Sequence, residues 1–406
     1  MASSPPSPIE VYDQIHQFEP LLPRSRLDEL SFATRSVVEK GHRLQGAASE
    51  SAREQLRQVV RSMNSYDSNR IEGQSTHPMN IDRAMKRDFS DKPDVAKLQR
   101  LAVAHIEAEQ ELEQQLPDQP DQAAALRSDW LLKSHASLYG RLSEEDRRAG
   151  DGHVVQPGVL RTEDVRVGRH QPPAWRSVPA FLARMDEVYA RPWGFDPMLY
   201  VVASEHHRAV WTHPFRDGNG RASRLQMHCA LWPLTAGLWS VNRGLARQRD
   251  RYYELLSNAD MARHGDLDGR GNLSERMLWE WCRFFIQLCE DQVSFMTKML
   301  DLGELKERIK GMVLYRGASA QYADYREEAV LPLHHVLAAG PVTRGEFVQM
   351  TGLADRTGRK VLAQLLKDGL LVSDGPKGRV GIGFPLDALH LLLPNLYPEA
   401  ATSPLD

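Results

Sequence analysis

The chain has 406 residues, of which 41% are hydrophobic and 26% are charged, as is usual for a globular protein. This length exceeds the usual size of one hydrophobic core, so we expect two or more domains. The formal net charge is only -3, so the overall charge excludes a general affinity for polyanions or membranes, and any such patch must be local.

Three cysteines, Cys229, Cys282 and Cys289, fall in apolar sequence typical of helices. Their odd number and wide spacing argue against a disulfide framework and a zinc site, and favour buried thiols. Residues 1–10 are rich in Ser and Pro and lack the apolar core of a signal peptide. The longest apolar stretch, around residues 229–239, is too short to cross a bilayer. The sequence therefore predicts a cytoplasmic protein.

The N-terminal part of the chain is predicted to be an arm followed by helices. Residues 1–25 are interpreted as a flexible arm, and helical periodicity dominates from Leu27 onward. Further long helices are expected at residues 93–116 and 130–142. One helical face is formed by apolar residues at helical spacing: Ala52, Leu56, Val59, Val60 and Met63.

Residues 150–173 interrupt this pattern with many glycines and prolines, and they predict an extended loop or a short hairpin. Helices resume afterwards, at residues 178–189, 197–212, from about 219, 246–259 and 274–307. The fold class predicted for this part of the chain is mainly α.

The tail follows a different pattern after a predicted linker at residues 311–326. Residues 330–338 indicate a helix, Thr343 and Glu346 have capping-box spacing, and residues 354–368 indicate a third helix that ends at Gly369. Two short strands are expected within residues 370–384. Three helices and a hairpin describe a winged helix-turn-helix domain, predicted at residues 327–400.

The charges of this tail leave its partner open. Basic residues occur on the expected recognition helix and wing, and acidic residues dilute them: Arg356, Arg359, Lys360, Lys377 and Arg379 against Asp355, Asp368 and Asp374. Winged helices bind DNA or dock proteins. A DNA-binding regulator with a ligand-sensing helical part is therefore an alternative to an enzyme.

The most informative segment covers residues 213–224 and reads HPFRDGNGRASR. The run Gly218-Asn219-Gly220 disfavours helix, yet an amphipathic helix follows at once. A loop that leads into a helix N-terminus presents free N–H groups and a positive dipole end to an anion. Glycines allow a phosphate to approach the backbone closely.

The charged residues of this segment fit the same chemistry. Arg221 and Arg224 are three residues apart and share a helix face, Asp217 offers a hard oxygen ligand for Mg²⁺, and His213 is the only base at neutral pH. Singly, each has a plain structural explanation: a turn, a cap, a solvated helix face. Together, within twelve residues, they indicate a phosphate-handling site. His206 and His207 complete no metal-ligand spacing and are interpreted as structural.

The segment resembles the Fic family motif, His-x-Phe-x-Asp/Glu-Gly-Asn-Gly-Arg-x-x-Arg, and departs from it nowhere. The resemblance extends over about residues 50–300 and implies a helical core, predicted at residues 26–310, with a small β-hairpin flap. It implies transfer of AMP from Mg-ATP to a Tyr, Thr or Ser hydroxyl of a protein, which could be the chain itself.

The resemblance also implies a role for each matching residue. His213 would be the base for the target hydroxyl, Phe215 would anchor the loop in the core, and Asp217 would hold Mg²⁺. The phosphates would contact the remaining motif positions, Gly218, Asn219, Gly220, Arg221 and Arg224. Removal of AMP, or transfer of another nucleotidyl or phosphoryl group, is related chemistry that the motif leaves open.

Two further segments resemble parts of the family. Residues 68–73 are similar to the Fic inhibitory motif, Ser/Thr-x-x-x-Glu-Gly/Asn, with Ser68 and Glu72 at its defined positions. The resemblance implies that Glu72, in an inhibitory segment at residues 50–73, pairs with Arg224 and blocks the γ-phosphate. The plain alternative is a helix-end carboxylate. Residues 157–173 resemble the flap, beside which an extended target segment would lie.

Overall fold

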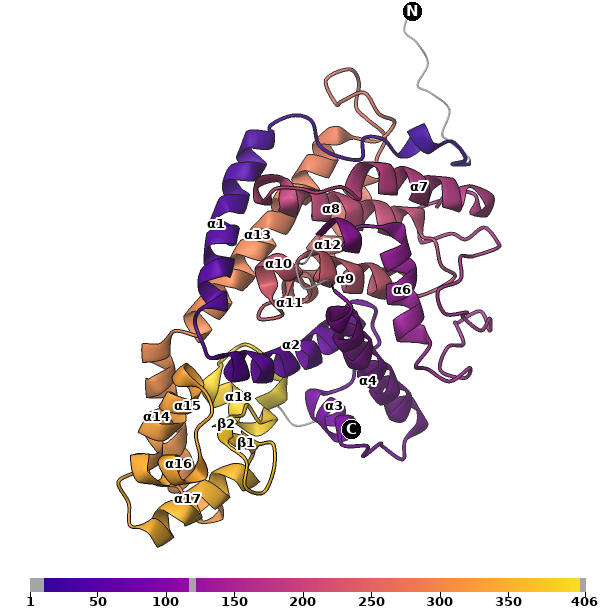
Figure 1. Cartoon of the computed structure of the whole chain (residues 1–406). Helices are drawn as coiled ribbons and strands as arrows, with labels where there is room; N and C mark the ends of the chain where they lie inside the picture. Colours follow the sequence, from indigo (N-terminus) through magenta and orange to yellow (C-terminus); the bar gives the residue numbers. More distant parts are fainter. Residues whose placement is uncertain (1–10, 117–121, 402–406) are drawn as a thin grey trace, which may run out of the picture. The chain divides into compact units, whose positions relative to one another are not determined.

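The computed structural model describes residues 11–116 and 122–401, which are mainly helical, as the sequence predicts (Figure 1). Its described part divides into two compact units. The first contains the residues up to Val37, Glu107–Pro233 and Gly244–Cys289, and the second contains Val38–Ile106, Leu234–Arg243 and the residues from Glu290 onward. No helix in the described ranges is both long and apolar enough to cross a membrane.

The helices of the first unit carry the motif segment. They are η1 (Ile15–Phe18), α5 (Gln122–Ala125), α6 (Ser128–Tyr139), η2 (Trp175–Ser177), α7 (Val178–Tyr189), α8 (Phe195–Thr212), α9 (Asn219–Ala230) and α12 (Arg249–Ala259). Other helices contain residues of both units: α1 (Leu27–Gln45), α4 (Pro93–Gln114), α10 (Trp232–Thr235), α11 (Val241–Arg247) and α13 (Glu275–Met299).

Helix α9 packs against α5, α6 and α8, and α8 also packs against α7. Every residue of α9 except Gly220 is buried, so this short helix lies inside the unit rather than on its surface. His206 and His207 of α8 are buried too, bonding to the Tyr252 hydroxyl at 2.9 Å and to the Leu256 carbonyl at 3.1 Å. Both contacts join α8 to α12, which fits the structural interpretation of these histidines.

The expected flexible arm at residues 1–25 includes described residues that pack into the first unit. Phe18 is fully buried and its ring meets that of Phe181 edge-on, with centroids 4.7 Å apart. Glu19 also pairs with Arg184 at 2.7 Å. Buried apolar contacts therefore fix a segment whose polar N-terminal composition suggested mobility. Residues 1–10 lie outside the described part.

The second unit contains α2 (Glu50–Ile71), α3 (Pro78–Met85), α14 (Leu302–Gly317), η3 (Ala320–Tyr322), η4 (Glu327–Ala329), α15 (Val330–Ala339), α16 (Arg344–Met350), α17 (Asp355–Lys367), β1 (Leu371–Ser373), β2 (Val380–Ile382), α18 (Leu386–Leu392) and η5 (Pro398–Ala401). The predicted apolar face of α2 is confirmed: Ala52, Leu56, Val59, Val60 and Met63 are all buried.

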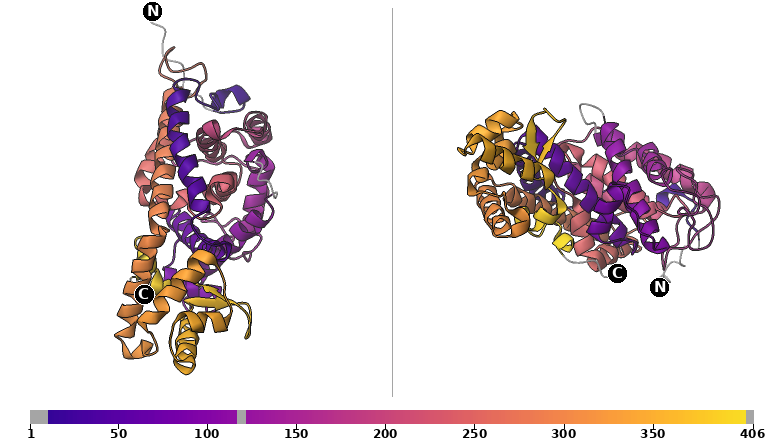
Figure 2. Two further views of the ribbon diagram at one scale, coloured as in Figure 1. Left: turned by 60° about the vertical axis from the view of Figure 1, so that its left-hand side comes forward. Right: turned by 90° about the horizontal axis from the view of Figure 1, so that it is seen from below.

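The C-terminal elements gather into one cluster, seen from two further directions in Figure 2. The predicted capping box is present, because the Thr343 hydroxyl accepts from the Glu346 N–H and the Glu346 carboxylate accepts from the Thr343 N–H. Strands β1 and β2 pair antiparallel, with Leu371 opposite Ile382. The predicted order of three helices and a hairpin is thus present, and the winged-helix assignment stays a prediction.

The predicted boundaries differ from the compact units. Residues 311–317, expected to belong to a linker, are the last turns of α14, which packs against α15 and α18. The long helix expected at residues 274–307 is interrupted, because the Asp301 side chain caps a new helix by accepting from the Glu304 N–H at 2.9 Å. The single core range expected at residues 26–310 is shared between the two units.

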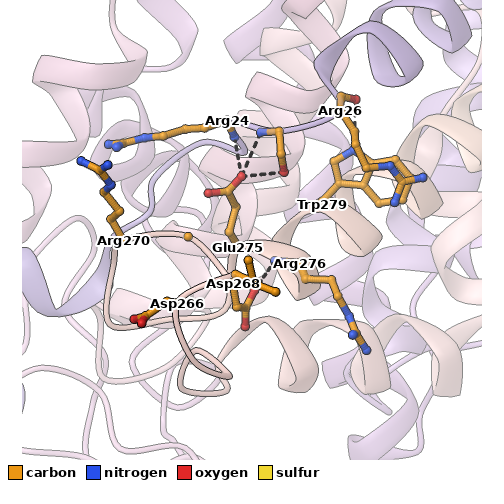
Figure 3. A pocket seen from close by; sticks show the side chains of 11 residues that line it. Arg24, Arg26, Asp266, Asp268, Arg270, Glu275, Arg276 and Trp279 are labelled. Carbon is orange, nitrogen blue, oxygen red and sulfur yellow. Dashed lines mark hydrogen bonds between the residues drawn. The ribbon is translucent and has the colours of Figure 1, made fainter.

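A pocket of about 550 Å³ in the first unit lies at the start of α13 (Figure 3). Its two buried carboxylates bind backbone N–H groups: Glu275 accepts from Arg24 and Ser25, and Asp268 accepts from His264 and Arg276. They therefore fasten loops together. No residue of the motif segment lines this pocket.

Candidate active site

The motif segment forms a tight connection between α8 and α9. His213 caps the C-terminus of α8 with left-handed backbone angles, φ 48° and ψ 60°. Gly218 precedes α9, also left-handed with φ 80°, and no side chain caps the helix there. A left-handed conformation is uncommon for a residue other than glycine. The predicted loop leading into a helix N-terminus is confirmed.

Gly218 is required by its neighbour as well as by its backbone. A Cβ atom at this position would lie 2.3 Å from the Tyr139 ring, closer than any real contact allows. The loop therefore passes directly against Tyr139 of α6. The Asp217 side chain, next to this glycine, remains 45% exposed and open to a ligand.

The imidazole of His213 is in the neutral form that a general base requires. Burial, followed by the nearby charges of His170 and Arg161, lowers the pKa of His213 to about 4. The backbone carbonyl of His213 accepts a bond from the Arg161 Nε atom at 2.9 Å. The ring of His213 is thus unprotonated at neutral pH, which is the form that a general base needs.

Two side chains fix the shape of the loop. Phe215 is fully buried, as the anchor prediction requires, and its ring stacks on His135 with centroids 3.9 Å apart. The Asn219 side chain accepts from the Phe215 N–H at 2.8 Å and donates to the Phe215 carbonyl at 2.9 Å. The amide of Asn219 is therefore committed to the loop backbone, so any contact with phosphate falls to its main-chain N–H.

The two motif arginines are buried rather than solvated. Arg221 is 4% exposed and Arg224 is 1% exposed. Arg221 donates to the Tyr139 hydroxyl at 2.9 Å and lies 3.6 Å from the Asp217 carboxylate. A guanidinium group in a low-dielectric setting attracts an anion far more strongly than one in water. The plain reading as a solvated helix face does not hold.

The segment of residues 157–173, here called the flap-like segment, is hydrogen-bonded to the loop of the motif segment. The Arg161 N–H donates to the Pro214 carbonyl at 2.9 Å, and the Gly158 N–H donates to His135 Nδ1 at 2.9 Å. Val167 and His170 form one isolated antiparallel bridge around a turn, and longer paired strands are absent from this described segment. Its many turn residues limit the expected hairpin to a single bridged pair.

The predicted inhibitory residues lie in the second unit, whereas Arg224 lies in the first. Ser68 is buried in α2, and Glu72 is the C-cap of that helix, followed by Gly73 with φ 73°. This local geometry agrees with a helix end, and the pairing of Glu72 with Arg224 stays a prediction.

Sequence reasoning missed His135, Tyr139 and the role of Arg161. His135 and Tyr139 are four residues apart on α6 and stack on each other at 4.5 Å. The four-residue spacing of His135 and Tyr139 is apparent in the sequence, but no sequence pattern indicates that this face of α6 lies beside the motif segment. A second missed group is Glu109, Glu113 and His228, whose ligand atoms lie within 4.8 Å of one another and could hold a metal. His228 and Glu113 already share a hydrogen bond of 2.9 Å.

Known proteins resemble the part of the chain that contains the motif segment. The Fic/DOC family model matches residues 125–231. A "Protein adenylyltransferase Fic" of Nematostella vectensis is 32% identical over 147 residues, which are 35% of this chain and 32% of that protein. Its counterpart in Culex quinquefasciatus is 36% identical over 121 residues, covering 29% of this chain and 23% of that protein. The matches thus span a third or less of these relatives.

A solved structure of C. elegans Fic-1 shares the fold, with a TM-score of 0.50 and 17% identity over 69% of this chain and 74% of that one. At this identity the likeness concerns the fold alone. The family match contains the whole motif segment and the α6 residues that contact it. Residues 125–231 of this chain therefore form a domain of the Fic/DOC family.

Proposed function

We propose that the chain is a protein adenylyltransferase that transfers AMP from ATP to a Tyr, Thr or Ser hydroxyl of a protein. One observation carries the proposal. A single loop and the helix that follows it contain a neutral histidine, His213, and two buried arginines, Arg221 and Arg224. The relatives named as adenylyltransferases support the same chemistry.

In this proposal ATP binds with its phosphates at the N-terminus of α9. The N–H groups of Gly218, Asn219 and Gly220 approach the phosphates, because no side chain caps this helix end. Arg221 and Arg224 compensate the phosphate charge. These donors are held in place before reaction, which is the main way in which a site lowers the barrier of a charged transition state.

Asp217 fits a magnesium ion. Its carboxylate is a hard oxygen donor, it is 45% exposed, and it lies beside the glycine that brings the backbone close. Mg²⁺ is usually held by one or two carboxylates together with substrate phosphates. When bound, the ion would neutralise part of the phosphate charge.

The residues of the chain then act on the acceptor hydroxyl. The hydroxyl oxygen attacks the α-phosphorus, the bond from the α-phosphorus to the bridging oxygen breaks, and pyrophosphate leaves. His213 accepts the hydroxyl proton, for which its ring must be unprotonated, as it is at neutral pH. The flap-like segment at residues 157–173 would bind the target backbone in extended form.

We also propose that Glu72 restrains this activity by pairing with Arg224. The support is the match of Ser68 and Glu72 to the inhibitory motif. The three cysteines are buried thiols, which fits a reducing cytoplasm, where we place the protein.

The test is mass spectrometry of the Glu72→Gly variant after incubation with Mg-ATP, alone and with a cell extract. The proposal predicts AMP on Tyr, Thr or Ser residues of the chain or of an extract protein. Phosphate on these residues instead of AMP, or removal of AMP from a modified protein, would replace the proposal by the related chemistry.

A second candidate function, DNA binding by the C-terminal elements, rests on the exposed basic side chains of α17. Arg356, Arg359 and Lys360 are exposed, although Arg359 pairs with Asp355 at 2.9 Å. A DNA mobility shift that weakens steeply with salt and with Arg356→Ala would support it. Absence of a shift at low salt would favour protein docking.

A further inference from the structure

A tyrosine hydroxyl separates the two charged groups of the motif that face each other. The Arg221 Nη2 atom donates to the Tyr139 hydroxyl at 2.9 Å, and that hydroxyl donates to the Asp217 Oδ2 atom at 3.3 Å. The donor and the acceptor of each hydrogen bond are fixed, because a guanidinium only donates and a carboxylate only accepts. We propose that Tyr139 is a positioning residue that sets the affinity of Asp217 for magnesium, an inference that rests on the proposed function.

The Tyr139 hydroxyl is shielded from solvent. Tyr139 is 2% exposed, so bulk water does not compete for the hydrogen bonds of its hydroxyl with Arg221 and Asp217. The Tyr139 hydroxyl binds one carboxylate oxygen of Asp217, while the Asp217 side chain is 45% exposed and accessible to an ion.

Without the hydroxyl, the two charges would pair directly. Arg221 and Asp217 belong to positions four residues apart, and their Nη2 and Oδ2 atoms already lie 3.6 Å from each other. A direct guanidinium–carboxylate pair is strong when it is sheltered from water. It would compete with Mg²⁺ for Asp217 and with phosphate for Arg221.

Packing places the hydroxyl independently of its hydrogen bonds. The Tyr139 ring lies against Gly218 and stacks on His135 at 4.5 Å. The His135 Nδ1 atom accepts from the Gly158 N–H, which leaves the His135 Nε2 atom to donate to the Asp217 carbonyl at 3.1 Å. A Tyr139→Phe variant keeps all these contacts and loses only the hydroxyl.

The experiment measures nucleotide binding without turnover. In a His213→Ala background, the affinity for a fluorescent ATP analogue is determined with Mg²⁺ and with EDTA, and the ratio of the two affinities reports the contribution of the metal. Tyr139→Phe should reduce this ratio about tenfold, as expected for losing one hydrogen bond to a charged group, and leave the affinity in EDTA within about twofold.

The matched control is Tyr189→Phe, which removes another buried phenol bond, one that joins Tyr189 to the Leu21 carbonyl at 2.6 Å rather than to Asp217 or Arg221. It should leave the ratio unchanged. Adding Arg221→Met to Tyr139→Phe should restore the ratio, because the competing cation is gone, although overall affinity falls. A merely structural role of Tyr139 would not produce this restoration.

The outcomes separate the two hypotheses. If the His213→Ala protein binds no nucleotide, the proposed function fails. If it binds with a clear magnesium effect that Tyr139→Phe leaves unaltered, or if Arg221→Met does not restore the ratio, the role of Tyr139 is refuted. Should Tyr139→Phe unfold, as judged by circular dichroism, the claim that packing alone places the ring is refuted with it.

Discussion

The imidazole of His135 lies nearly parallel to the ring of Phe215, with centroids 3.9 Å and planes 15° apart. Helix α6 therefore holds the loop that carries His213 and Asp217. His135 adds hydrogen bonds to the Asp217 carbonyl and to the Gly158 N–H, so one buried side chain joins the motif loop to the flap-like segment.

Replacing His135 by alanine should destabilise the first unit and loosen the loop. The variant loses two hydrogen bonds and two ring stacks, on Phe215 and on Tyr139, which together contribute about 2–6 kcal/mol. Urea unfolding followed by tryptophan fluorescence measures the loss. A midpoint equal to that of the unaltered protein would show that His135 does not hold the loop.

Glu72→Gly should raise AMP transfer, including transfer to the chain itself. If Glu72 pairs with Arg224, the γ-phosphate cannot reach that arginine and the α-phosphate is misplaced, and such misplacement costs on the order of 100-fold. Initial rates at saturating Mg-ATP measure the effect. Arg224→Ala should not activate the protein, because it removes the phosphate ligand together with the block. Equal rates for Glu72→Gly and the unaltered chain would make Glu72 a helix-end residue only.

Asp217→Ala should leave very little turnover, and that remainder should respond weakly to magnesium. The reason is that Asp217 is the exposed carboxylate of the motif, and Mg²⁺ binding relies on such a group. A magnesium titration of the transfer rate checks this. An unchanged midpoint would assign the ion to other ligands, and Glu109 and Glu113 would then be the next positions to vary.

Stability should decrease as the pH falls below about 6.5, the ordinary pKa of histidine. Burial lowers the pKa of His135 and His213 to about 4 and that of His206 to about 3. Between these values and 6.5 the unfolded chain binds more protons than the folded chain, so protonation favours unfolding. The stabilisation is thus complete above the unfolded pKa and is lost progressively as the pH falls toward 4.

Urea unfolding at about pH 7 and about pH 5 measures this change. A His206→Asn variant should show a shallower decrease, since it removes one of the groups that must remain neutral. Equal free energies of unfolding at the two pH values would contradict the burial of these histidines as neutral rings.

A fragment of residues 326–401 should unfold less cooperatively than a fragment of residues 301–401. Helix α14 packs against α15 and α18, so the shorter fragment exposes the apolar faces that these helices turn toward it. Thermal circular dichroism compares the two. Melting curves of equal sharpness would restore the linker that the sequence suggested at residues 311–326.

The sequence was informative where the chemistry is local. His213 to Arg224 are consecutive, so glycines, charges and the following helix could be read together, and the capping box at Thr343 is equally local. Tyr139 and Arg161 reach the motif only through the packing of α6 and the loop of residues 150–173. Their partners are distant in sequence, and no periodicity encodes such contacts.

Two segments differ from the local pattern for the same reason. Phe18, within the expected arm, is buried against Phe181 of a distant helix. Residues 311–317, within the expected linker, continue α14 to Gly317, and α14 packs against α15 and α18. Tertiary contacts decided both segments.

The central claim is most directly tested by incubating the Glu72→Gly protein with ATP that carries a radioactive label at either the α- or the γ-phosphate. AMP transfer predicts that protein becomes labelled from the α-position only, that labelling requires Mg²⁺, and that adding His213→Ala reduces it by about 100-fold or more. Label from the γ-position, or α-labelling that survives His213→Ala within a factor of about two, would contradict the assignment.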